Sequence, residues 1–133
     1  MSFAVRQAWS TDLDAIVDLV ADCQADPEQM CFYLSTDPAA LRVELQDVDG
    51  FDDWTTATWV ALDDARNVIG CIGVDADPEI GRLWWRGPFV SDASSPLADA
   101  IADGLFSAAV TTIVGFGGLH DRLTVTDGAR HHL

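Results

Sequence analysis

Three runs of β-forming residues follow one another between residues 55 and 90, and only short turns separate them. The runs read "TTATWVALDD", "VIGCIGVDAD" and "RLWWRGPFV". The segments between them, "DDARN" and "ADPEIG", are rich in turn-forming residues. Strands joined by such short connections run antiparallel, so the sequence predicts a three-stranded meander. In the middle run, Gly70 and Gly73 predict a bulge or a close approach of another backbone.

Helix signals precede this meander. Residues 3–7 alternate as a short first strand, and Ser10–Thr11, with Asp14 three residues after Thr11, predicts a capped helix that ends before Pro27. Asp37 followed by Pro38 predicts a second helix, which ends at Gly50.

A third helix and a fifth strand follow the meander. Ser95 and Pro96 begin a helix whose apolar residues recur at helical spacing, and "TTIVGF" at 111–116 then predicts a strand. A strand, a helix and a strand in succession form a parallel pair with a right-handed crossover. The predicted class is therefore α/β with a mixed sheet. The tail stays open, because Thr124–Thr126 with Asp127–Gly128 favour a hairpin while its spaced leucines favour a helix.

Composition limits the function classes. The 133 residues, 49% of them hydrophobic, suit one domain spanning 1–133. We expect a cytoplasmic protein, because neither a secretory signal nor an apolar run of about 18 residues is present. A net charge of −15 without any lysine argues against nucleic acid or membrane partners, whose phosphates need basic residues. Such a surface attracts amines, although it also serves solubility.

The cysteines and histidines do not predict a metal site. Cys23, Cys31 and Cys71 lie in apolar stretches without zinc-type spacing and are expected to be buried free thiols. His131 and His132 lie at the C-terminus, and no third ligand is spaced for a metal.

Several stretches together resemble the GNAT (Gcn5-related N-acetyltransferase) superfamily. "VRQAWSTDLDAIVDLV" is similar to the family's first strand and helix, "WVALDDARNVIGCIGV" to its strand–turn–strand, and "LWWRGPFV" to a strand of some multi-domain members. The resemblance covers residues 3–116 and implies N-acyl transfer from acetyl-CoA to a small amine.

One family motif is missing. The resemblance implies that a glycine-rich loop after the fourth strand, with an Arg or Gln, binds the pyrophosphate of acetyl-CoA through backbone N–H groups. The corresponding stretch here, "VSDASSPLADAI", has neither glycine nor a basic residue, and Asp92 adds a negative charge. The residues that remain as candidates for binding the cofactor are Phe89, Val90, Ser91, Ser94 and Ser95.

Candidates for the chemistry are few. Asp77 and Glu79 are the candidates for the base that deprotonates the amine, although both lie in a turn where solvated acids are common. The family often protonates the thiolate with a late tyrosine, whereas the only tyrosine here is Tyr33. Trp84 and Trp85 face opposite sides of their strand, and one of them lines either a partner surface or a helix layer.

The basic residues of the same strand also need an interpretation. Arg82 and Arg86 are expected on one face of the strand, where they could hold an anionic ligand, although we expect pairing with the abundant carboxylates.

Two functions therefore stay open at this stage. The first is an acetyl-CoA-dependent N-acyltransferase domain. The second is a non-catalytic GNAT-like domain that packs on a catalytic partner or forms a homodimer. Only 17 residues follow Phe116, fewer than the family's complete domain needs. The chain therefore looks like the degenerate N-terminal unit of a tandem-GNAT protein, and its partner would be a second GNAT domain or a second copy.

Overall fold

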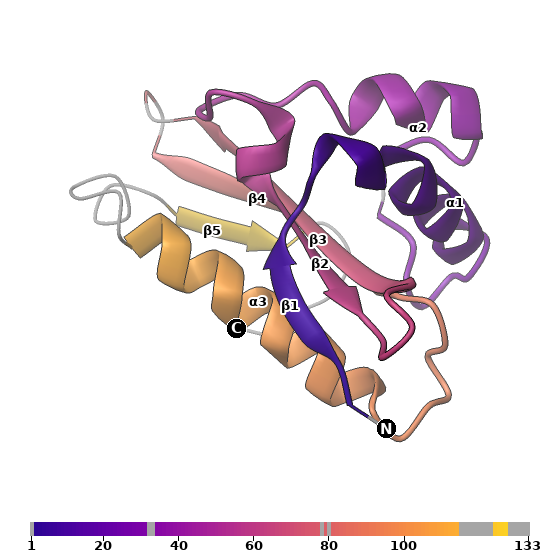
Figure 1. Cartoon of the computed structure of the whole chain (residues 1–133). Helices are drawn as coiled ribbons and strands as arrows, with labels where there is room; N and C mark the ends of the chain where they lie inside the picture. Colours follow the sequence, from indigo (N-terminus) through magenta and orange to yellow (C-terminus); the bar gives the residue numbers. More distant parts are fainter. Residues whose placement is uncertain (1, 32–33, 78, 80, 115–123, 128–133) are drawn as a thin grey trace.

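The computed structural model describes residues 2–31, 34–77, 79, 81–114 and 124–127. Five strands and three α-helices make up its regular structure (Figure 1). In chain order they are β1 (Ala4–Gln7), α1 (Leu13–Gln24), α2 (Pro38–Glu44), β2 (Thr58–Leu62), β3 (Val68–Asp77), β4 (Arg82–Val90), α3 (Ala98–Val114) and β5 (Thr124–Asp127). Short 3-10 turns at Ser10–Asp12 and Trp54–Ala57 precede α1 and β2.

The strands form one mixed sheet in the order β1-β2-β3-β4-β5. β1 to β4 are antiparallel neighbours, which confirms the predicted meander. β5 runs parallel to β4, which confirms the predicted parallel pair on either side of the third helix but not the position predicted for its second strand. The α/β class with a mixed sheet is therefore confirmed.

Helices cover both faces of this sheet. α1 and α2 lie on one face, and α3 crosses the other (Figure 1). Side chains of β4 pack on both faces of the sheet: Phe89 contacts the α1 side, while Trp85 and Val90 contact the α3 side. Trp85 is 2% exposed, and its ring lies 4.9 Å from that of Phe106 on α3. Trp84 faces the side of α1 and α2 and is half-buried.

Gly70 and Gly73 mark the features that the sequence predicted. A Cβ at Gly70 would lie 2.9 Å from Ile101 Cγ2, so glycine lets α3 approach the sheet closely. The pairing of β3 with β4 shifts register between Cys71 and Gly73. Opposite that shift, Gly87 has φ +98°, a conformation that favours glycine.

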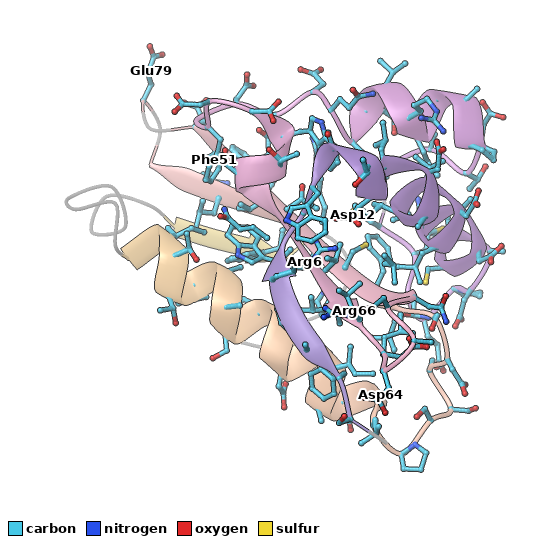
Figure 2. The ribbon with its side chains drawn as sticks, viewed as in Figure 1. Arg6, Asp12, Phe51, Asp64, Arg66 and Glu79 are labelled. Atoms are coloured by element: carbon cyan, nitrogen blue, oxygen red, sulfur yellow. The ribbon has the colours of Figure 1, made fainter. Side chains whose placement is uncertain are left out.

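The start of α1 differs from the predicted cap. Asp12, rather than Asp14, accepts a hydrogen bond from the backbone N–H of Trp9 at 2.7 Å, so the cap lies two residues earlier. Arg6 of β1 reaches the same carboxylate at 2.7 Å and 3.2 Å (Figure 2). This pairing joins the first strand to the first helix. The predicted start of α2 is confirmed, because Asp37 accepts from Ala40 N at 3.0 Å.

The predicted fifth strand at 111–116 is wrong, because residues 111–114 form the last turn of α3. β-branched side chains suggested a strand, but Ile113 is 2% exposed within the core under α3. The hydroxyl of Thr112 also donates to Ala108 O at 2.9 Å, which suits a helix. Residues 115 and 116 lie outside the described part of the chain. The parallel partner of β4 is instead Thr124–Asp127, within the tail that the sequence left open.

Candidate functional site

The loop that connects β4 to α3 folds around Asp92, which accepts hydrogen bonds from the residues that follow it. The backbone N–H and the hydroxyl of Ser94 both donate to Asp92 Oδ1, at 3.1 Å and 2.6 Å. The N–H of Ser95 donates to Asp92 O at 3.1 Å. The hydrogen bond from the Ser94 hydroxyl, followed by that from its N–H, lowers the pKa of Asp92. The loop therefore carries an ionised carboxylate that accepts two donors of Ser94, while Ser95 N–H bonds to the backbone carbonyl of Asp92.

Ser95 serves the start of α3. Its hydroxyl oxygen accepts from Leu97 N at 3.1 Å, and its carbonyl accepts from Ala98 N at 3.0 Å. These two bonds form a turn that leads into α3, and the helix begins at Ala98 rather than at the predicted Pro96, so Ser95 is not its N-cap.

The five residues that the sequence proposed for cofactor binding lie in one segment but in different environments. Phe89 and Val90 are core residues, 1% and 2% exposed. Ser91 is exposed, and its N–H donates to Ile69 O at 2.9 Å. Ser94 and Ser95 have the partners given above. Of these five residues, the serines therefore supply the polar side-chain groups at the surface, whereas Phe89 and Val90 belong to the core.

A groove of about 330 Å³ lies beside this connection. Its lining residues are Glu28, Gln29, Val90, Ala93, Ala98 and Asp99. None of these lining residues is basic, and Asp92 lies next to Ala93. A pyrophosphate needs N–H donors and positive charge, so these residues do not fit one.

Gln29 covers the outer edge of β4 at Val90, by which we mean the N–H and C=O groups of Val90 that face away from β3. The described pairing with β5 ends at Trp85 with Asp127. Farther along β4, Gln29 Oε1 accepts from Val90 N at 3.0 Å, and Gln29 Nε2 donates to Val90 O at 3.1 Å. Gln29 is 6% exposed. Sequence reasoning missed this residue, because no local pattern shows where a loop glutamine will point.

The candidate bases lie at the opposite end of β4. Asp77 is in register with Arg82, at the start of β4, whereas the connection follows Val90 at its end. Glu79 is exposed and projects from the turn away from the rest of the molecule (Figure 2). Its N–H donates to Asp77 Oδ1 at 3.0 Å. The structure thus brings the two acids to one turn but not to the β4–α3 connection.

A second cavity, of about 440 Å³, lies near that end of the sheet. Its lining residues are Asp49, Asp75, Ala76, Asp77, Trp84 and Arg86. Arg86 is 8% exposed and donates to Glu44 O at 2.9 Å and to Asp47 O at 3.0 Å. Its ion pair with Asp75 spans 3.6 Å, which confirms the expected pairing with a carboxylate, while Arg82 is exposed. Arg86 thus ties β4 to the end of α2.

The cysteine expectation is confirmed. Cys23, Cys31 and Cys71 are free and buried. Burial raises the pKa of Cys23 to about 11 and also raises the pKa of Cys71. These two thiols therefore stay protonated and unreactive near neutral pH.

Other expectations can be compared only with the described residues. Those residues hold no group of three or more potential metal ligands. No helix among them has the length and apolarity needed to cross a membrane. Tyr33 and the three histidines lie outside the described residues.

Comparisons with known proteins show a likeness in structure and none in sequence: no family model matches the chain, and no curated protein does. A GCN5-related N-acetyltransferase from Kribbella flavida superposes with a TM-score of 0.63 at 16% identity, over 86% of this chain and 67% of that one. An Escherichia coli GNAT family N-acetyltransferase in complex with CoA has a TM-score of 0.55 at 18% identity, over 86% and 58%. N-acetylglutamate synthase from Neisseria gonorrhoeae, complexed with coenzyme A and N-acetyl-glutamate, has a TM-score of 0.54 at 16% identity, over 84% and 23%.

These likenesses establish the fold. The chain has the fold of the GNAT N-acetyltransferases, as the resemblance in sequence predicted. It spans about a quarter of the Neisseria gonorrhoeae protein and 58% of the Escherichia coli one. Both of those proteins are structures in complex with coenzyme A.

Proposed function

We propose that this chain is a GNAT-type domain of an acetyl-CoA-dependent N-acetyltransferase and serves there as a packing unit. Acetyl-CoA is then held by a partner unit, either a second GNAT-type domain or a second copy of this chain. The observation that carries the proposal is the closed connection between β4 and α3. The Asp92 carboxylate accepts hydrogen bonds from Ser94 in the loop, and the Gln29 carboxamide bonds to both the N–H and the C=O of Val90.

Charge supports the same conclusion. The groove beside the connection has Glu28 and Asp99 on its walls. The whole chain carries a net charge of −15. An anionic cofactor would meet repulsion at this groove, because ionised side chains there have few cations to balance them.

Titration calorimetry with acetyl-CoA, with CoA as a control, tests the proposal. The chain alone is expected to give no saturable heat and no thermal shift at millimolar ligand. Saturable binding at micromolar ligand would contradict it. Sedimentation over a range of protein concentrations distinguishes the partners, because a reversible dimer indicates a second copy and a monomer indicates a second domain.

A second candidate function is acetyl transfer to a small amine by this chain itself. The cavity near Arg86 favours it, because Asp49, Asp75 and Asp77 line that cavity beside the ring of Trp84. Carboxylates and an indole ring attract an ammonium group. Acetyl transfer that Asp77→Asn slows and Glu79→Gln leaves unchanged would support this candidate. The two substitutions are matched, since both acids share one turn while only Asp77 lines the cavity.

A further inference from the structure

A row of three residues crosses the middle of the sheet with a glycine at its centre. Thr58 of β2 is in register with Gly73 of β3, and Gly73 is in register with Arg86 of β4. Residues in register on neighbouring antiparallel strands point to the same face of a sheet. The side chains of Thr58 and Arg86 therefore flank the place that a side chain of residue 73 would take.

A cavity of about 10 Å³ lies at this place. Thr58, Gly73 and Arg86 line it from the sheet, and Ile16 and Val20 line it from α1. Ile16 and Val20 are 1% and 0% exposed, so the cavity lies inside the core between α1 and the sheet. Its volume is about that of one water-sized sphere, which gives room for a single water molecule.

The polar atoms at this cavity include a donor and an acceptor. Within the described part of the chain, Arg86 Nε is buried and has no hydrogen-bond partner. The other nitrogens of Arg86 donate to Glu44 O at 2.9 Å and to Asp47 O at 3.0 Å. A buried N–H of a charged group is costly when it is unpaired. The Thr58 hydroxyl donates to Trp54 O at 2.8 Å, so its oxygen is able to accept a further hydrogen bond.

A second acceptor faces the same place. A Cβ at Gly73 would lie 3.7 Å from Ala57 O and 3.7 Å from Arg86 Cδ, the carbon next to Nε. The N–H of Arg86 Nε, Thr58 Oγ1 and Ala57 O therefore surround one position. Buried waters typically make about three hydrogen bonds to polar groups of this kind.

We propose that this cavity is a binding site for one structural water, which accepts from Arg86 Nε and donates to Thr58 Oγ1 and Ala57 O. The absence of a side chain at Gly73 provides the room for it. The water fixes the guanidinium group that joins β4 to the end of α2. The site is separate from the proposed function, because none of its groups belongs to the connection between β4 and α3.

NMR of the wild-type chain with nitrogen-15 label in arginine is the first test. We expect a nuclear Overhauser cross-peak between the Hε of Arg86 and a long-lived water. This Hε should also exchange with solvent at least about tenfold more slowly than the Hε of exposed Arg66. The cross-peak is decisive, since burial alone also slows exchange. Its absence at Arg86 would overturn the inference.

A methyl group at residue 73 gives a second test, because the sign of its effect depends on the water. Gly73→Ala suits the backbone, since Gly73 has no positive φ and the new Cβ would make ordinary contacts of 3.6 Å and 3.7 Å. The variant should lose the cross-peak and unfold at a lower temperature than the wild type, because Arg86 Nε loses its partner. In a dry cavity the methyl would gain contacts and alanine would restrict the unfolded chain, so a higher unfolding temperature would overturn the inference.

Two substitutions at residue 58 form a matched pair. Thr58→Val keeps the shape of the side chain but removes the hydroxyl, and it should weaken the cross-peak at Arg86. Thr58→Ser keeps the hydroxyl and should keep the cross-peak. Thermal stability alone does not separate these variants by their effect on the water, since Thr58 also bonds to Trp54 O. Equal cross-peaks in both variants would overturn the proposed site, because Thr58 would then take no part in it.

Discussion

The two halves of β4 differ in what borders their outer side. Arg82–Trp85 have β3 on one side and β5 on the other. At the other end, Val90 has β3 on one side and the carboxamide of Gln29 on the other. A strand neighbour extends the sheet and builds the fold, whereas a side chain satisfies one residue and leaves a groove beside it. The first half of β4 is therefore part of the continuous sheet, and the second half ends beside the groove of about 330 Å³.

The largest effect is expected in the half that two strands border. Trp85→Ala should lower the free energy of unfolding by about 3–5 kcal/mol, because it removes a buried ring from the core under α3. Urea unfolding measures this loss. Trp84→Ala, on the half-buried neighbour, is the matched control and should cost less than half as much. Equal losses would mean that the α3 face is not the dominant core of this strand.

The second prediction concerns the segment that closes the other half. Gln24→Ala should cost about 2–4 kcal/mol, because buried backbone groups at Cys31 and Leu34 lose their partner. The substitution should also speed hydrogen exchange of the Val90 amide, since the same segment carries Gln29. Exchange at Val90 as slow as in the wild type would show that Gln29 is positioned without Gln24.

A third prediction uses pH, at a site far from β4. Burial acts to raise the pKa of Asp12, but hydrogen bonds from Arg6 and Trp9 outweigh it, and the pKa is lowered. A lowered pKa in the folded state gives stability that is present above the unfolded value and is lost as pH falls through the folded one. Asp12→Asn should cost about 1–2 kcal/mol at neutral pH and progressively less below pH 3.8.

Urea unfolding of the wild type and Asp12→Asn at several pH values measures this difference. Asp18→Asn is the control, because Asp18 is an exposed acid on the same helix, whereas Asp14 pairs with Arg42. A cost for Asp12→Asn that does not change with pH would mean that the carboxylate charge is not what joins β1 to α1.

The smallest effect is expected in the exposed connection itself. Asp92→Ala should leave the unfolding midpoint unchanged within error while the Ser94 amide exchanges faster, because only exposed hydrogen bonds are lost. It should also leave the chain unable to bind acetyl-CoA, since Gln29 still covers Val90. If Asp92→Ala alone bound acetyl-CoA, the charge of Asp92, and not Gln29 at Val90, would be what prevents binding in the wild type.

The sequence predicted those features that depend on local patterns. The meander follows from β-forming runs with short turns, and the start of α2 follows from Asp37 beside Pro38. Gly70 and Gly73 predicted a bulge or a close approach of another backbone, and the structure has a register shift between Cys71 and Gly73 and a close side chain of α3 at Gly70. The fifth strand was misplaced, because Thr112 and Ile113 favour a strand locally but are stabilised in α3 by a hydrogen bond and by burial.

The site was harder to predict, because its contacts join residues far apart in the chain. The missing glycines and the presence of Asp92 could be read from the sequence, but the contact between Gln29 and Val90 spans 61 positions. Arg86 was expected to pair with carboxylates, yet its two bonds to carbonyls near the end of α2 depend on tertiary packing. Side-chain direction in loops follows from the fold and not from spacing.

The most direct test of the central claim is an NMR titration of the wild-type chain with acetyl-CoA, followed at the amide of Val90. We predict that the Val90 resonance does not shift at millimolar ligand, because Gln29 Oε1 already accepts its hydrogen bond. A saturable shift of Val90 and Ala93 would contradict the account. It would show that the groove beside α3 holds the cofactor and that Gln29 does not close the edge.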